Sequence, residues 1–538
     1  MKSRLSPTIL FSTRFVVIAL VFAGSGFLGS AQSIPGTMGG FKSKEVRVGQ
    51  WYWSDADGPP VVSPDGRHVA YADRTHCEKG SIMCVFLDGE AIPAEHGTYV
   101  GQVAISPDGK RAAFESSKAS MFVTGNQEHW VVVDGKREVG YNTISQMVFS
   151  PDGKHLAYSA RTWTSGRSAF SMVAGNVPQW KVVLDGVEGP AYPEGLVPIP
   201  MNPFFTPDGR LVYSAWRDKR RFFVIDGKEV GAGWSWALNP SFNPDWKRLA
   251  FVGCQQANKD CSAIVDGKPG PVYDEIYRNF VFFSPDGKHF WYGGKKNGKW
   301  TAVVDGNQGP FYDQIYNQYC QTSAQVSILP FQPWGLEKQC WIPSYSFFSP
   351  DGKHTWYTAK KGDHWVAVED GQEGSEFADI SANAFSPDNS HIAFAAWESG
   401  KSSAKLQLDG KEIATAERIA NPFFSPDSNH VGFVTYKLAG LAGVKWAMAV
   451  DSQIGAEYSE IGQSGFSPDS KHFAYLAKAT GGKWTVVIDG RESGEYSLIV
   501  PGTFKFGADG ALEFLAVRKD PDSKNGNSLY RVKYTPNP

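Results

Sequence analysis

The stretch Phe283-Ser-Pro-Asp-Gly-Lys-His-Phe-Trp-Tyr292 decides the fold of this chain, because close variants of it recur along the sequence. The recurring Asp stands at Asp65, Asp108, Asp152, Asp208, Asp245, Asp286, Asp351, Asp388, Asp427, Asp469 and Asp509. The mean spacing of these residues is about 44 residues, which is typical of a repeated unit of four strands.

A second phrase, an apolar run followed by Asp-Gly, comes after each of the first ten copies; only Asp451 is followed by Ser452 instead of Gly. Its Asp stands at Asp88, Asp134, Asp185, Asp226, Asp266, Asp305, Asp370, Asp409, Asp451 and Asp489. Two turn signals in each period, separated by β-branched and aromatic runs, indicate strands and not helices.

The copy around Asp286 shows how the unit divides into strands. We expect strands at Phe280–Phe283, His289–Tyr292, Trp300–Val304 and Phe311–Ile315. In the first turn Pro presets φ, the Asp carboxylate can bond nearby backbone N–H groups, and Gly permits a positive φ. The sequence therefore predicts an antiparallel four-stranded meander.

Such a meander cannot bury both of its faces alone, so the copies must stack radially as the blades of an all-β propeller. Aromatic residues, 14% of the chain, are suited to the filling between blades. Because propellers usually close at four to eight blades, eleven units predict two tandem propellers. We expect about six units in 46–318 and about five in 345–535, with a disulfide-bracketed insert at 319–344. One oversized ring is the alternative.

The repeats Phe149–Tyr158 and Phe283–Tyr292 resemble the WD40-like propeller repeats of TolB-type proteins, and the resemblance extends from about residue 45 to the end. It implies the β-propeller fold. It indicates little about function, because this repeat serves many different proteins.

The first residues have the layout of a secretory signal peptide. Lys2, Arg4 and Arg14 precede the apolar run Phe15–Leu28, and small residues follow up to Ala31. We expect a signal peptide at 1–31, cleaved after Ala31, a linker at 32–45, and export to the periplasm or the medium. An uncleaved anchor is the alternative.

The six cysteines form three local pairs in the sequence, which fit disulfides in an oxidising compartment: Cys77 with Cys84, Cys254 with Cys261, and Cys320 with Cys340. A metal site would need closer spacing and additional Cys or His ligands at matching intervals. We therefore expect neither a structural metal nor a cofactor.

Charge and motifs exclude several classes of function. The formal net charge is −2 and the basic residues are dispersed, so nucleic acid is not an expected partner. No other segment is apolar enough to insert into a membrane after signal cleavage. The sequence also lacks the nucleophile elbow of an appended α/β-hydrolase, HExxH and nucleotide motifs.

Seven histidines occupy one position of the repeat, three residues after the turn Asp, and two further copies have Arg111 and Arg248 there. The seven histidines are His68, His155, His289, His354, His391, His430 and His472. A catalytic base is needed once, so we interpret these residues as structural groups that bond neighbouring turns. The turn Asp residues likewise stand singly, unlike the dense carboxylates of a calcium loop.

Successive connections of a meander alternate between the two faces of a ring. The Ser-Pro-Asp-Gly and Asp-Gly turns therefore share one face, called here the turn face. The connections between strands two and three and between units share the other, the loop face. The loop face has the irregular segments, including Arg161–Gln179 and the Cys320–Cys340 loop.

Variable loops on a rigid scaffold commonly bind ligands, and exposed aromatic residues commonly anchor them. The candidate binding residues are Trp163, Arg167, Phe170, Tyr316, Tyr319, Trp334 and Trp341. We expect an exported, non-catalytic binding or scaffold protein for a protein or cell-envelope ligand. These aromatics could instead only pack their loops. The competing function is a propeller-type lyase or glycosidase with acids around a central channel, and an adhesive surface protein is a third.

Overall fold

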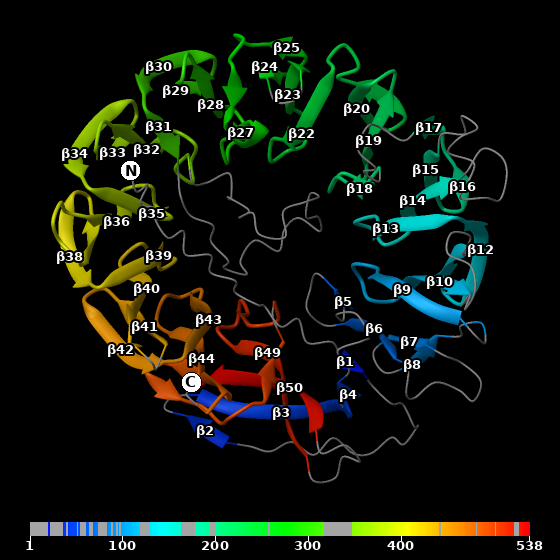
Figure 1. Cartoon of the computed structure of the whole chain (residues 1–538). Helices are drawn as coiled ribbons and strands as arrows, with labels where there is room; N and C mark the ends of the chain where they lie inside the picture. The colour runs from blue at the N-terminus through cyan, green and yellow to red at the C-terminus, as the bar shows by residue number, and fades with distance from the viewer. Residues whose placement is uncertain are drawn as a thin grey trace, which may run out of the picture.

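The computed structural model describes residues 20–21, 36–38, 41–50, 52–53, 61–63, 68–73, 83–87, 90–92, 95, 98–118, 128–162, 178–193, 201–256, 259–316, 347–440, 443–479, 481–500, 502–520 and 527–537. These residues form antiparallel sheets that stand radially around one centre (Figure 1). The predicted all-β propeller fold is confirmed.

The first five blades follow one another along the chain. Blade 1 contains β5 (Val61–Val62), β6 (Val69–Asp73), β7 (Cys84–Leu87) and β8 (Glu90–Ile92). Blade 2 contains β9 (Thr98–Ile105), β10 (Ala112–Lys118), β11 (His129–Val133) and β12 (Lys136–Tyr141). Blade 3 contains β13 (Thr143–Phe149), β14 (Leu156–Thr162), β15 (Gln179–Leu184), β16 (Val187–Glu188) and β17 (Tyr192–Pro193). Blade 4 contains β18 (Phe204–Phe205), β19 (Leu211–Arg217), β20 (Arg220–Ile225) and β21 (Lys228–Val230). Blade 5 contains β22 (Trp236–Phe242), β23 (Leu249–Gln256), β24 (Lys259–Val265) and β25 (Lys268–Pro269).

The remaining blades continue the same order. Blade 6 contains β26 (Glu275–Ile276), the 3₁₀ turn η2 (Tyr277–Asn279), β27 (Phe282–Phe283), β28 (Phe290–Lys296), β29 (Lys299–Val304) and β30 (Asn307–Tyr312). Blade 7 contains β31 (Gln314–Tyr316), β32 (Trp356–Lys361), β33 (His364–Glu369) and β34 (Gln372–Phe377). Blade 8 contains β35 (Asp379–Phe385), β36 (Ile392–Trp397), β37 (Ala404–Leu408) and β38 (Lys411–Ala416). Blade 9 contains β39 (Arg418–Phe424), β40 (Val431–Leu438), β41 (Val444–Val450) and β42 (Gln453–Tyr458). Blade 10 contains β43 (Glu460–Phe466), β44 (Phe473–Lys478), β45 (Trp484–Ile488) and β46 (Arg491–Glu492).

Blade 11 joins the two ends of the described chain. It contains β47 (Leu498–Ile499), β48 (Lys505–Phe506), β49 (Leu512–Lys519) and β50 (Asn527–Pro536), and its outer strands are β3 (Phe41–Gln50) and β2 (Gly36–Met38). The antiparallel register of β3 with β50 runs from Phe41↔Pro536 to Gln50↔Ser528. The predicted linker at 32–45 is therefore wrong for 41–45, which are strand. A short pair of β1 (Leu20–Val21) and β4 (Tyr52–Trp53) completes the strands.

Buried side chains fill the spaces between neighbouring blades and close a single ring. One cluster joins each consecutive pair from blade 1 to blade 11. A further cluster packs Tyr71 and Phe86 of blade 1 against Leu515 and Leu529 of blade 11. Among the described residues the units thus follow the single-ring alternative, and the expected division into two propellers is not observed.

The expected seam between two propellers lies inside one blade. Ile315 of β31 pairs with Ala359 of β32, and Phe348, on the far side of the predicted insert, bridges to Thr355 just before β32. Both ends of the insert thus belong to the first strand of blade 7, and Tyr312 of blade 6 packs in one cluster with Phe348. The insert interrupts an inner strand and does not separate two domains.

A repeated aromatic pair joins the outer halves of neighbouring blades at six junctions. An aromatic residue near the outer edge of one blade meets an aromatic residue of the following blade's second strand edge to face, as Tyr141 and Tyr158 do at 6.2 Å between ring centroids. The same arrangement joins Tyr192 to Tyr213, Tyr273 to Tyr292, Tyr312 to Tyr357, Phe377 to Phe394 and Tyr458 to Tyr475. Such pairs add to the burial of apolar area.

Blade 11 shows that β3 takes the role of an ordinary fourth strand. In other blades the Tyr at the end of the fourth strand donates its hydroxyl to an acid near the start of the next blade's fourth strand. Tyr458 donates in this way to Glu492 at 2.6 Å, and Tyr312 to Glu373 at 3.0 Å. Tyr496 of blade 10 donates in the same way to Glu45 of β3, at 3.1 Å. The N-terminal strand therefore closes the ring in register.

Candidate functional site

The turn face is held by two repeated sets of hydrogen bonds. In the first turn the Ser hydroxyl donates to the turn Asp, and the residue two positions after that Asp donates its backbone N–H to the same oxygen; in blade 3 these are Ser150 and Lys154 with Asp152, at 2.6 and 3.1 Å. These bonds, led by the one from Ser150, lower the pKa of Asp152 to about 2.

In the second turn all nine described Asp residues have a positive φ. The Gly that follows eight of them also has a positive φ, as in a type I′ hairpin turn. The Asp carboxylate then accepts from the backbone and from the repeated imidazole, as Asp305 does from Phe290 N and His289 Nδ1, at 2.9 and 2.6 Å. Equivalent imidazole bonds join His155 to Asp185, His354 to Asp370, His391 to Asp409, His430 to Asp451 and His472 to Asp489. The predicted structural role of these six histidines is confirmed. His68 bonds its backbone N–H to Ser63 Oγ, and its second-turn partner Asp88 lies outside the described residues.

Neighbouring first turns are also bonded to each other. Where Arg replaces the repeated His, its guanidinium reaches the next turn, as Arg111 does to the carbonyl oxygens of Gly153 and Lys154 at 3.1 and 2.6 Å. Elsewhere the next turn contributes a side-chain acceptor, as Asn389 Oδ1 does for the N–H of Asp351 at 2.7 Å. Gly352 has a φ of +77°, and a Cβ there would stand 2.7 Å from Asp286 Oδ1. The polar groups of the turn face therefore serve the ring itself.

The loop face repeats a different arrangement at the start of the third strand. The residue five positions before the second-turn Asp is Trp in five blades: Trp180, Trp300, Trp365, Trp446 and Trp484. In three of these blades a lysine stands opposite on the second strand and over the indole. The Lys Nζ to ring-centroid distances are 5.4 Å for Lys295 and Trp300, 5.8 Å for Lys360 and Trp365, and 5.3 Å for Lys478 and Trp484.

Carboxylates on the first strand complete two of these groups. Glu275 lies 3.5 Å from Lys295 Nζ, and Glu460 lies 3.3 Å from Lys478 Nζ. Asp379 holds the equivalent register position in blade 8, opposite Trp397, and burial raises its pKa. Lysine–carboxylate pairs occur on the turn face as well, but at this end of the blades they lie beside indoles, of which Trp300 and Trp484 are partly exposed.

Five blades depart from Trp at this position: blade 1 has Met83 there, and blade 2 has a carboxylate–imidazole pair. His129 takes the place of Trp in blade 2, and its Nδ1 lies 2.7 Å from Glu115 Oε1, with side chains 21% and 14% exposed. The Glu115 carboxylate covers Gly101, where a Cβ would stand 2.4 Å from Oε2. Among the described blades, this pairing of Glu and His at the loop-face end occurs once.

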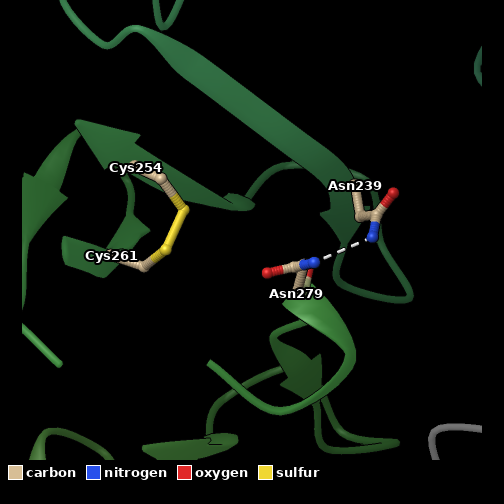
Figure 2. Close-up of a disulfide and its surroundings, with 4 residues drawn as sticks. All are labelled: Asn239, Cys254, Cys261 and Asn279. Carbon is tan, nitrogen blue, oxygen red and sulfur yellow. Dashed lines mark hydrogen bonds between the residues drawn. A yellow bond between two sulfur atoms is a disulfide. The ribbon is translucent and has the colours of Figure 1, made fainter. Parts of the chain in front are cut away.

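Blade 5 has a disulfide at this position, and blade 8 has Ala404. Cys254 and Cys261 are cross-strand partners and are bonded, as predicted. Figure 2 shows this disulfide beside the innermost strands, where Asn239 Nδ2 donates to the carbonyl oxygen of Asn279 in blade 6, at 3.1 Å. Cys84 is also disulfide-bonded. Cys77, Cys320 and Cys340 lie outside the described residues.

Blade 4 has Arg221 at this position, and sequence reasoning missed it. Its only signal in the sequence is that it replaces the recurring Trp. This recurrence became visible only once the strand register was known. The cation and the indole are exchanged here, because Trp216 is the partner of Arg221 on the second strand.

The binding residues predicted from the sequence are not tested. Trp163, Arg167, Phe170, Tyr319, Trp334 and Trp341 lie outside the described residues, and of Tyr316 only the backbone, at the end of β31, is described. The described residues on either side of the 319–344 insert, Tyr316 and Phe348, belong to the first-strand region of blade 7 and not to a loop-face connection.

Comparison with known proteins places no family on this chain. No family model and no curated protein matches it. Among solved structures, TolB from Acinetobacter baumannii is 16% identical over 46% of this chain and 62% of that one, with a TM-score of 0.23. The tricorn protease is 12% identical over 91% of this chain and 55% of that one, with a TM-score of 0.25. The β-propeller domain of the Trilobed protease from Pyrococcus furiosus is 13% identical over 65% of this chain and 94% of that one, with a TM-score of 0.25. TolB is the protein type whose repeat the Ser-Pro-Asp-Gly unit resembles, and the propeller assignment itself rests on the strand pairing of this chain.

Proposed function

We propose that this chain is an exported, non-catalytic propeller that recognises a protein or cell-envelope ligand through its loop face. The observation that carries the proposal is the difference in how the two faces use their polar groups. On the turn face the repeated Ser, Asp, His and Arg side chains bond to one another. The loop face repeats Trp–Lys groups in which the three lysines, Trp300 and Trp484 are partly exposed, and partly exposed aromatic and basic residues are frequent anchors at interfaces.

Two observations support export. The Cys254–Cys261 disulfide suits an oxidising compartment. In the part of the chain that the structure describes, no helix has the length and apolar character needed to cross a bilayer. The signal peptide at 1–31 remains a prediction, and amino-terminal sequencing of the exported protein tests it.

The test of binding compares lysines on the two faces. Lys295, Lys360 and Lys478 are replaced together by Ala in one variant; in the matched control Lys110, Lys154 and Lys288 of the turn face are replaced by Ala. Both variants lose three positive charges, and both sets lie on second strands or their preceding turns. We expect only the loop-face variant to lose capture of partners from an envelope extract or of purified cell-wall sacculi, with both melting temperatures near that of the parent. Equal capture by both variants would contradict the proposal.

The competing function, a propeller-type carbohydrate-active enzyme, has one observation in its favour. The Glu115–His129 pair is the single carboxylate–imidazole pair at the loop-face end of a described blade, and such pairs can exchange protons with a substrate. The test is a screen of lyase and glycosidase substrates with the parent and Glu115→Gln. Turnover that Glu115→Gln abolishes would favour the enzyme over the binding protein.

A further inference from the structure

The junction of blades 4 and 5 differs from every other described junction, because the two blades share one continuous sheet. The strand β20 pairs antiparallel with β19 and β21, and its residue Arg221 also forms a parallel bridge with Trp236 of β22. Arg221 is thus a register partner of both Trp216 and Trp236. The two indoles meet edge to face, with centroids 4.9 Å apart and planes at 87°.

The guanidinium of Arg221 has no counter-charge among the described residues. Its Nε is buried and has no hydrogen-bond partner among those residues, whereas neither of its two Nη groups is a buried atom without a partner. The backbone N–H of Arg221 is satisfied by Ser235 O at 3.0 Å. Burial lowers the pKa of Arg221, and no carboxylate opposes that effect. The guanidinium keeps its charge, because its delocalised cation is not deprotonated in proteins.

Two neighbouring cations and two of the equivalent cations have partners, in contrast to Arg221. Arg217 on the adjacent strand bonds Glu229 at 2.7 Å, and Arg220 bonds the carbonyl of Ala232 at 3.5 Å. Lys295 and Lys478, the cations at the same repeat level in blades 6 and 10, lie beside Glu275 and Glu460. In blade 4 the cation and the indole have exchanged strands. This exchange alone does not explain why no carboxylate lies beside Arg221 among the described residues.

An unpaired buried charge is unfavourable. Five other blades have the uncharged Trp at this position, so the fold itself does not require a charge there. The connection between β19 and β20 is a two-residue turn, Asp218–Lys219, in which both residues have a positive φ. We propose that Arg221 binds an oxyanion, a carboxylate or phosphate group of the ligand, beside the partly exposed Trp236. This inference rests on the proposed binding function, whose ligand chemistry it names. Arg supplies the two parallel N–H donors that such groups prefer.

The test measures binding of short anionic oligomers to the purified full chain by calorimetry. Oligogalacturonate supplies carboxylates, poly(glycerol phosphate) supplies phosphates, and methyl-esterified oligogalacturonate is the uncharged control. We expect one or both charged oligomers to bind and the ester not to. Arg221→Met and Arg221→Trp should weaken that binding about tenfold or more, since a charge-assisted hydrogen bond is lost. Lys154→Met, which removes a cation of the turn face, should change it less than about twofold.

Stability separates a ligand site from a structural role. Arg221→Trp restores the residue found in five other blades, so its melting temperature should equal or exceed that of the parent. A lower melting temperature of both Arg221 variants, with anion binding unchanged, would overturn the inference. Loss of partner capture in the loop-face lysine variant, together with no anion binding at Arg221, would leave the proposed function standing and remove this inference alone. If Arg221 binds anions but replacement of the loop-face lysines does not affect capture, this inference would stand and the proposed function would fall.

Discussion

The turn face and the loop face are built by the same repeat, yet they use their polar residues in opposite ways. On the turn face, the groups around Asp152 and Asp305 recur from blade to blade with nearly the same distances. On the loop face, the position that is Trp300 in blade 6 becomes His129, Arg221, Cys261 or Ala404 in other blades. A repeated bond indicates what the ring needs; a departure from the repeat at an equivalent position indicates where a blade has a further task.

The comparison presumes that both faces belong to one ring, so the largest predicted effect concerns ring closure. Deletion of residues 36–50 removes β2 and β3 from blade 11. The strand β50 then has an unpaired edge, and Tyr496 of blade 10 loses its hydrogen bond to Glu45. We expect loss of cooperative thermal unfolding, measured by calorimetry. A chain that begins at residue 32 is the control and should unfold like the parent. Unchanged unfolding of the deletion variant would show that blade 11 does not close the ring.

Two neighbouring aspartates compare the faces directly. Asp305 on the turn face accepts bonds from Phe290 and His289 and has a φ of +51°, whereas Asp313 on the loop face accepts from Gly362 N at 2.9 Å. Asp305→Ala loses two bonds and strains the backbone, so we expect a loss of about 3 kcal/mol in unfolding free energy. Asp313→Ala should cost about 1 kcal/mol. Urea unfolding measures both, and equal losses would contradict the stated asymmetry.

The pH dependence of stability sharpens the account of the turn face. The Asp152 pKa is lowered to about 2, so its contribution is complete above the unfolded value of 3.8 and is lost as the pH falls toward 2. The hydrogen bond that His354 donates to Asp370 raises the His354 pKa, so that contribution is complete below 6.5 and is lost as the pH rises through the higher folded value.

Unfolding measured across pH tests both signs. Asp152→Asn should flatten the fall in stability between pH 4 and 2, and His354→Asn should flatten the fall above pH 6.5. Variants whose profiles parallel the parent's at both ends would show that these bonds do not couple to folding.

The smallest effect is expected for a loop-face cation. Lys478→Ala removes a partly exposed contact over Trp484 and an ion pair with Glu460, and should lower the unfolding free energy by about 0.5 kcal/mol. Urea unfolding measures it. A loss as large as that of Asp305→Ala would mean that the Trp–Lys groups hold the ring together and are not free to serve ligands.

The sequence predicted those elements whose turns carry strong local chemistry. Ser-Pro-Asp-Gly and Asp-Gly located strands two and three closely, as in the predicted Trp300–Val304 and the observed Lys299–Val304. The role of the repeated histidines followed from repetition alone. The strand β3 was missed because neither turn phrase adjoins it, and only Glu45 marks its equivalence to other fourth strands.

The parts that failed depend on contacts between units. The single ring is decided by packing of blade 11 on blade 1, which no local pattern encodes. The insert after Tyr316 was assigned to a connection because first strands are short and interrupted by bulges, so they give weak signals. Arg221 emerged only when the strand register showed which residue of each blade occupies one position.

The most direct test of the central claim, that ligands meet the loop face and not the turn face, is lysine footprinting. The protein is acetylated with and without captured ligand, and modification is quantified by mass spectrometry at Lys299, Lys361 and Lys483 of the loop face and at Lys110, Lys154 and Lys288 of the turn face. All six are well exposed, with side chains at least half accessible. The account predicts protection of the loop-face lysines alone; protection of the turn-face lysines, with the loop face unchanged, would contradict it.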